Sequence, residues 1–167
     1  MDRLHGKVAI VTGGGNGVGK EHALLLASEG AKVVVNDLGE DAESTASEIN
    51  NSGGKAISVQ GNVAEWETGE RLVSAAIESF GDLHILINNA GMLRDAMSFS
   101  MNEKQFDEVI AVHLKGHFVC ARAAAVYWRK EAKSARNPQE ELSIQVANLA
   151  YSEVQASQIM LLQKGGY

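Results

Sequence analysis

A short apolar strand that runs directly into a glycine cluster constrains the fold of this chain most strongly. Residues 7–12 (KVAIVT) are rich in β-branched side chains, which is typical of a strand buried on both faces. Gly13, Gly17 and Gly19 follow in the order G-x-x-x-G-x-G, and residues 20–30 then have a helical pattern that ends in glycine. A glycine turn between a strand and a helix lets backbone N–H groups approach a phosphate. The opening residues therefore predict a phosphate-binding loop.

The alternation of strand and helix continues along the chain. Further strands are predicted at residues 31–37, 55–60 and 82–88, and further helices at residues 40–51, 65–80 and from 103 to about 133. Strands that alternate with helices at this spacing form a parallel sheet with right-handed crossovers. The predicted fold class is α/β: a Rossmann-type doubly wound parallel sheet, truncated after the fourth strand and the long helix that follows it.

The pattern divides the chain into two parts. We expect residues 1–133 to form one nucleotide-binding domain. Residues 134–167 contain no apolar β-branched run, so we expect an irregular tail without a further strand, or with a short helix within residues 152–163.

Composition narrows the classes of partner and the compartment. The net charge of −6 argues against nucleic acid or an anionic membrane as the main partner, because both attract basic surfaces. No apolar run approaches the roughly 20 residues that span a bilayer. Cys120 is the single cysteine, so an internal disulfide is excluded, and no leader pattern is visible at the N-terminus. We therefore expect a cytoplasmic location.

An acidic residue closes the second predicted strand at the place where dinucleotide-binding folds recognise the ribose. Asp37 lies 18 residues after Gly19. An acid there accepts hydrogen bonds from the adenosine ribose and repels a 2′-phosphate. We therefore expect the cofactor NAD in preference to NADP. The alternative is a solvated acid at a strand end.

Two motifs together carry a resemblance to a known family. Residues 12–19 (TGGGNGVG) and residues 88–91 (NNAG) after the fourth predicted strand resemble the short-chain dehydrogenase/reductase family, over roughly residues 4–130. Residues 35–39 (VNDLG), 89–95 (NAGMLRD) and 112–116 (VHLKG) are similar to the branch that contains the 3-hydroxyacyl-CoA dehydrogenase unit of multifunctional β-oxidation enzymes. The resemblance implies an NAD-dependent oxidoreductase of a secondary alcohol or ketone, with a 3-hydroxyacyl thioester as one candidate substrate.

The resemblance also implies which residues hold the cofactor. Asn89, Ala90 and Gly91 would line its adenine and ribose side, and Asn62-Val63 stands where the family usually has Asp-Val beside the adenine. The complete predicted cofactor site comprises Gly13, Asn16, Gly17, Val18, Gly19, Asp37, Leu38, Asn62, Val63, Asn89, Ala90 and Gly91. No metal site is predicted.

A histidine in the long predicted helix has two interpretations. His113 stands where many family members have an asparagine that helps to hold a proton-relay water. It is equally well explained as a histidine packed in the helix. We expect His22, His84 and His117 to be packed or exposed without a functional role.

The family's catalytic set is not visible in this sequence. Its chemistry requires a tyrosine and a lysine four residues later, because that spacing puts the ammonium beside the phenol and lowers the phenol pKa. Tyr127 is followed at this spacing by Glu131 and Tyr151 by Gln155, while Tyr167 is the last residue. No catalytic residue is therefore predicted.

The genetic code offers one explanation for the missing set. Residues 140–167 can be back-translated with synonymous codons that, in a shifted frame, give RIINTSSELGLFGSASKPNYAAAKGGI. This string resembles the family's continuation, with serine, tyrosine and lysine at the family's spacing. Our hypothesis is that the reading frame slipped between about residues 127 and 140.

Three interpretations follow from the sequence. The chain is a truncated, catalytically silent dehydrogenase, or a noncatalytic NAD-binding or interaction module, or the product of a sequence error in a gene for an active enzyme. A sheet that ends at its fourth strand leaves an unpaired edge. We therefore expect marginal stability, weakened NAD affinity, and self-association through this edge and the long helix.

Overall fold

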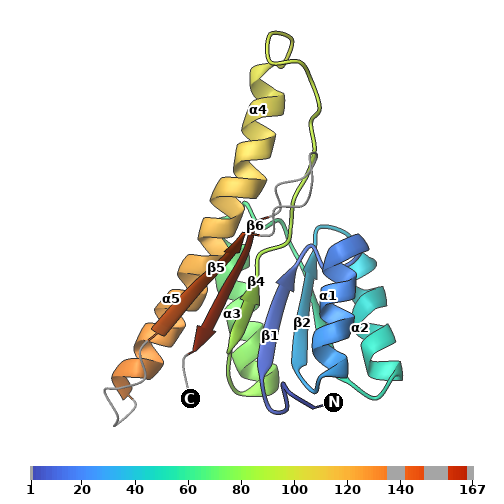
Figure 1. The fold of residues 1–167 in the computed structure, drawn as a ribbon, viewed down its shortest axis with the longest axis vertical. Coiled ribbons are helices and arrows are strands. Elements are labelled where there is room, and N and C mark those ends of the chain that lie inside the picture. The colour runs from blue at the N-terminus through green and yellow to red at the C-terminus, as the bar shows by residue number, and fades with distance from the viewer. Residues whose placement is uncertain (1, 135–141, 149–157, 165–167) are drawn as a thin grey trace.

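The computed structural model describes residues 2–134, 142–148 and 158–164, and within them the chain forms one mixed sheet with helices on both faces (Figure 1). The strands run in the spatial order β3-β2-β1-β4-β6-β5. The first four are parallel, which confirms the α/β fold class. They are β1 (Val8–Thr12), β2 (Lys32–Asp37), β3 (Lys55–Gln60) and β4 (Ile85–Ile87).

Helices cover the two faces of the sheet and form two hydrophobic clusters with it. The helices are α1 (Gly17–Ser28), α2 (Asp41–Asn51), α3 (Trp66–Phe80), α4 (Glu103–Ile110), a π-helical turn (Ala111–Gly116) and α5 (His117–Ser134). Val8 and Ile10 of β1 lie in the cluster with α3 and α5, while Ala9 and Val11 lie in the cluster with α1 and α2. Strand side chains alternate between faces, so a strand covered on both sides must be apolar throughout.

The parallel part of the sheet ends after β4, as expected, but the sheet itself continues. β6 (Gln158–Lys164) pairs antiparallel with β4, and β5 (Leu142–Asn148) pairs antiparallel with β6. The expectation of no further strand after residue 134 is therefore wrong, and residues 158–163 are strand rather than helix; residues 152–157 lie outside the described residues.

Two features explain the added strands: the open backbone edge of β4, and an alternation of apolar and polar residues in the sequence. An open strand edge presents unpaired N–H and C=O groups that another strand can satisfy. Residues 142–148 (LSIQVAN) alternate apolar and polar side chains over most of their length, which is a strand pattern.

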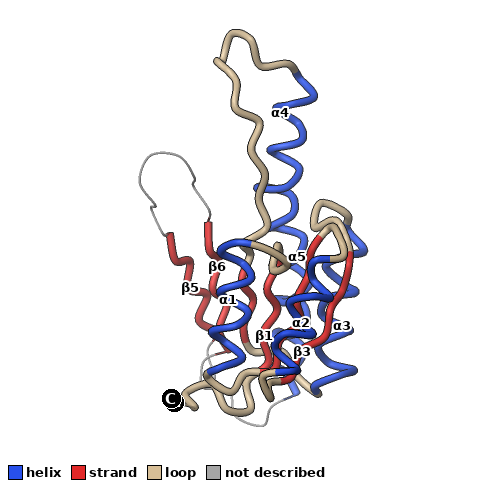
Figure 2. The backbone as a smooth tube through the Cα atoms, turned by 90° about the vertical axis from the view of Figure 1, so that its right-hand side faces the viewer, coloured by secondary structure: helices blue, strands red, loops and turns tan. Residues whose placement is uncertain are grey.

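The long helix projects beyond the body of the molecule at its α4 end (Figures 1 and 2). A capping box between Asn102 and Gln105 begins it. By length and composition alone, Glu103–Ser134 is also long and apolar enough to cross a membrane. The core helices of soluble proteins meet the same criterion, and in α5 the side chains of Cys120, Ala124 and Trp128 are buried in the cluster with α3.

Candidate functional site

The glycine loop between β1 and α1 packs too tightly for a side chain at Gly13 or Gly19. A Cβ atom on Gly19 would lie 2.0 Å from the Gly13 carbonyl oxygen, and one on Gly13 would lie 2.8 Å from the Cα of Ala90. Gly17 begins α1 with a φ of 52°, and nothing lies within 4 Å of the place where its Cβ would be. The loop therefore forms a cradle that is open on the side where the helix N-terminus presents its N–H groups.

Asp37 lies beside this cradle and is held by backbone amides. Its carboxylate accepts a hydrogen bond from the Gly15 N–H at 2.9 Å and another from the Leu38 N–H at 2.7 Å. Leu38 itself is exposed, as are Asn16 and Val18 on the other side of the loop. The structure thus brings the predicted acid and the predicted loop together at the carboxyl end of the sheet.

The segment after β4 is fastened to the same loop. The Asn89 side-chain amide donates to the carbonyl oxygens of Thr12 at 3.1 Å and Gly13 at 3.0 Å. The Thr12 hydroxyl accepts from the backbone N–H groups of Asn89 and Ala90. These bonds fix the spacing between β1 and β4 at the point where ligands bind in open α/β sheets.

Asn62 and Val63 come to this end of the sheet from β3. The Asn62 side chain accepts from the Ala64 N–H at 3.0 Å and so shapes the turn into α3. Val63 is buried, and a Cβ on Gly116 would lie 2.7 Å from its methyl group. All predicted cofactor-site residues therefore lie around the carboxyl ends of β1 to β4.

Two histidines from the long helix hold the segment after Asn89. The His113 Nε2 lies 2.9 Å from the Met92 carbonyl oxygen, and a Cβ on Gly91 would lie 2.8 Å from the His113 ring. The His117 Nε2 lies 3.0 Å from the Ala90 carbonyl oxygen. His117 is buried, which lowers its pKa below the usual range of histidine.

The sequence prediction for His117 therefore missed its contact with the site. The signal that could have found it is the i, i+4 spacing from His113, which puts two side chains on one helix face. The π-helical turn at Ala111–Gly116 between the first part of the helix and α5 is a feature that recurs at functional sites.

Tyr127 lies far from the glycine loop, at the amino end of β4. Its hydroxyl donates to the Asp82 carboxylate at 2.7 Å, and burial together with that carboxylate raises the pKa of the phenol above its usual range. A phenol in this environment does not act as a base near neutral pH. Tyr151 and Tyr167 lie outside the described residues. Within the described residues, no group of three or more His, Cys, Asp or Glu side chains could hold a metal ion.

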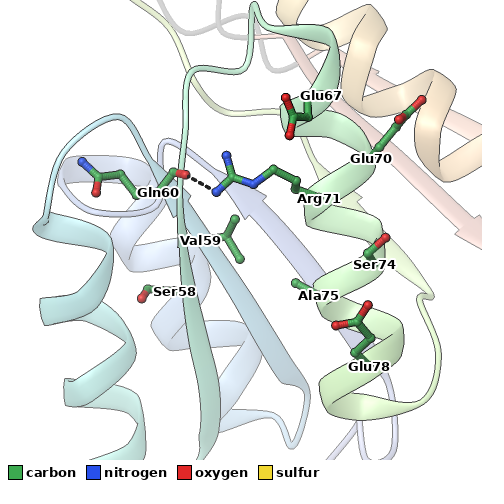
Figure 3. A pocket seen from close by; sticks show the side chains of 9 residues that line it. All are labelled: Ser58, Val59, Gln60, Glu67, Glu70, Arg71, Ser74, Ala75 and Glu78. Atoms are coloured by element: carbon green, nitrogen blue, oxygen red, sulfur yellow. Dashed lines mark hydrogen bonds between the residues drawn. The ribbon is translucent and has the colours of Figure 1, made fainter.

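A separate open pocket lies between β3 and α3 (Figure 3). Glu67, Glu70 and Glu78 line it, and the Arg71 guanidinium at its centre donates to the Gln60 carbonyl oxygen at 2.9 Å. Three carboxylates with one already engaged cation repel a diphosphate. The pocket is therefore a poor place for an anionic dinucleotide, in contrast to the cradle of the glycine loop.

Comparison with known proteins identifies relatives of this chain. Residues 7–136 match the family model described as short chain dehydrogenase. The chain is 46% identical over 138 residues to a hydroxyacyl-CoA dehydrogenase, ChsB1, of Mycobacterium tuberculosis, covering 79% of this chain and 43% of that protein. It is 42% identical over 139 residues to peroxisomal multifunctional enzyme type 2 of Drosophila melanogaster, covering 77% of this chain and 23% of that protein.

A solved structure shows the same fold. The crystal structure of a short chain dehydrogenase from Mycobacterium avium superposes with a TM-score of 0.78 at 46% identity, over 80% of this chain and 49% of that one. The chain therefore spans less than half the length of these relatives. Proteins of this kind typically bind a nicotinamide cofactor. On the family match and the shared fold, the chain belongs to the short-chain dehydrogenase family.

Proposed function

We propose that this chain binds NAD in the cradle of the glycine loop, with Asp37 as the residue that accepts the ribose hydroxyls. The observation that carries the proposal is the position of the Asp37 carboxylate, held by the Gly15 amide at the edge of the cradle. The residues fit the cofactor because the loop is open at Gly17, where nothing lies within 4 Å of the Cβ position, and because no lysine or arginine occurs at positions 36–54 to attract a 2′-phosphate.

The reaction class of the whole protein is proposed from its relatives. We propose oxidation of a secondary alcohol to a ketone, with a 3-hydroxyacyl thioester as the substrate class, because a relative at 46% identity is named as a hydroxyacyl-CoA dehydrogenase. NAD, when bound, accepts the hydride of this reaction. The chain's own contribution is to bind and orient the dinucleotide through Gly13, Asp37 and Asn89.

We propose further that the chain as it stands binds the cofactor without turning over substrate. Support comes from Tyr127, whose hydroxyl is bound to Asp82 away from the cradle. A noncatalytic NAD-binding or interaction module is the second candidate. A stable, soluble chain with micromolar NAD affinity favours the module, and weak binding by a marginally stable chain favours the silent dehydrogenase.

The test is a calorimetric titration of the chain with NAD⁺. We expect Asp37→Ala to weaken NAD⁺ binding about tenfold, because it removes a charge-assisted acceptor of ribose hydroxyls. Glu78→Ala, in the pocket beside α3, is the matched control and leaves the affinity unchanged. Equal affinity in the wild type and Asp37→Ala contradicts the proposed role of Asp37. Formation of NADH from a 3-hydroxyacyl thioester contradicts catalytic silence.

The displaced reading frame and the compartment are also proposals. The family match ends at residue 136, within the interval where the frame slip is placed, which supports it. Resequencing the gene across the codons for residues 127–167 decides the matter, because codons that do not encode the shifted string rule it out.

A cytoplasmic location is proposed from the buried free thiol of Cys120, while several relatives bear the word peroxisomal in their names.

We propose that the chain self-associates through its long helix, so that its partner is a second copy of itself. We call five exposed apolar side chains, spaced one or two helical turns apart, the helix stripe: Phe106, Ile110, Leu114, Phe118 and Val126. The α4 end of this helix carries a net negative charge (Glu103, Asp107 and Glu108 against Lys104), and the remainder carries a net positive charge (Lys115, Arg122, Arg129, Lys130 and Lys133 against Glu131). Two copies that pack antiparallel place opposite charges together across a two-fold axis.

A further inference from the structure

The first turn of α2 touches the glycine loop at a point that the sequence motifs do not include. Asp41, the first residue of α2, accepts a hydrogen bond from the Asn16 side-chain amide at 2.6 Å. A Cβ on Gly15 would lie 2.7 Å from the Asp41 Cβ and 2.8 Å from an Asp37 carboxylate oxygen. Asp37 and Asp41 therefore approach the same point of the loop from two different elements.

Further contacts hold this arrangement in place. The buried Thr45 hydroxyl, one turn further along α2, donates to the Gly15 carbonyl oxygen at 3.1 Å. Gly15 is thus fixed by Asp37 at its N–H and by Thr45 at its carbonyl group. Because Asn16 holds Asp41 from the loop side, the Asp41 carboxylate has a defined position relative to Asp37.

The charges around this point are negative. Glu40, Asp41 and Glu43 lie at or within the first turn of α2, and Glu43 bonds to the Ser58 hydroxyl. The cation of Lys20 on α1 is paired with Glu48 at 2.7 Å. A helix N-terminus ordinarily attracts an anion, but acidic side chains in the first turn offset that field.

We propose that Asp41 is a second determinant of cofactor choice, which acts with Asp37 to exclude a 2′-phosphate. A ribose hydroxyl donates a hydrogen bond to Asp37 without conflict with a second carboxylate. A phosphate at the same oxygen carries up to two negative charges, and two carboxylates offer it no hydrogen-bond donor and repel it. Asn16 is the positioning residue that holds Asp41. The inference rests on the proposed binding of NAD at Asp37.

The test compares the dissociation constants of NAD⁺ and NADP⁺ for the intact chain by calorimetry. We expect Asp41→Asn to tighten NADP⁺ binding about 3- to 10-fold, since it removes one repulsive charge, and to change NAD⁺ binding less than about twofold. The asparagine still accepts the hydrogen bond of Asn16. Asp41→Ala removes the charge and the hydrogen bond together, and we expect it to tighten NADP⁺ binding as well. Raising the salt concentration lowers the wild type's preference for NAD⁺ over NADP⁺, because salt screens the repulsion between Asp41 and the 2′-phosphate.

The matched control is Glu40→Gln, which removes one charge from the N-cap of the same helix without touching the loop. If the effect depends on the position of Asp41, Glu40→Gln leaves the ratio of the NAD⁺ and NADP⁺ dissociation constants unchanged. An unchanged ratio in both Asp41 variants, with NAD⁺ bound normally, overturns the role of Asp41 and leaves the proposed function standing. An equal change in Glu40→Gln also overturns it. A wild-type chain that binds neither dinucleotide overturns the proposed function and this inference together.

Discussion

At the scale of single residues, the contact between the glycine loop and the segment after β4 leaves no free volume. Gly19 faces both the Gly13 carbonyl oxygen and the Asn89 side chain, and Asn89 in turn bonds to Thr12 and Gly13. A substitution here has to move backbone atoms rather than a flexible side chain. The loop is therefore as important for the packing of the segments that follow β1 and β4 as it is for binding a ligand.

We predict that Gly19→Ala lowers the free energy of unfolding by about 2–4 kcal/mol, because its Cβ would lie 2.0 Å from the Gly13 carbonyl oxygen. Urea unfolding followed by circular dichroism measures the change. Gly39→Ala is the control, since nothing lies within 4 Å of its Cβ position. If the two variants unfold at the same urea concentration, the tight packing of the loop is refuted.

We predict that the stability of the chain falls as the pH drops below about 6.5, and that His117 contributes to this fall. Burial lowers the pKa of His117 in the folded chain, and the nearby His113 acts in the same direction. The unfolded chain therefore binds the proton first, so the stability is present above pH 6.5 and is lost as the pH falls through the folded pKa. His117→Gln reduces this slope between pH 7 and 5 in urea titrations. An unchanged slope contradicts the assignment.

At the scale of elements, each predicted helix and parallel strand is present, with ends that differ by a few residues. The second strand begins at Lys32 rather than residue 31, and β4 covers only Ile85–Ile87 of the predicted 82–88. At the amino end the shortening has a local cause, because the Asp82 side chain bonds to the Leu83 N–H and to Tyr127. Side-chain hydrogen bonds of this kind compete with the backbone hydrogen bonds of the sheet, and hydrophobic periodicity does not predict them.

We predict that Phe118→Glu in the helix stripe weakens self-association at least tenfold. Phe118 packs with Trp66 at a ring distance of 6.2 Å, yet more than half of its surface is exposed. A carboxylate there has to be desolvated in an interface between two copies. Analytical ultracentrifugation over a concentration series measures the change. Phe99→Glu, outside the stripe and 85% exposed, is the control and leaves association unchanged. A wild type that stays monomeric at all concentrations contradicts the proposal.

At the scale of the whole molecule, the sheet is completed by residues that come last in the described chain. Leu162 of β6 is in register with Leu86 of β4 on one side and with Ile144 of β5 on the other. β6 therefore covers the edge that β4 would otherwise expose. This pairing reduces the reason to expect association through the edge of β4 and moves the open edge to β5.

We predict that Leu162→Pro lowers the free energy of unfolding by about 3 kcal/mol or more, because proline removes an N–H from the interior of a paired strand. Thermal unfolding by circular dichroism and light scattering follow the loss and the aggregation that a newly opened edge allows. Gln158→Pro, at the first residue of the strand, is the control. Identical unfolding of Leu162→Pro and the wild type would show that β6 adds nothing to the fold.

The sequence by itself determined the α/β fold class, the glycine loop, the position of Asp37 at the end of β2 and the family. These features are local, because β-branched runs, helical periodicity and glycine turns act on neighbouring residues. Only the tertiary structure decided that Asn16 holds Asp41, that His117 holds Ala90 and that β6 pairs with β4. Such contacts join residues far apart in the chain, and their geometry depends on how the helices pack on the sheet, which local periodicity does not encode.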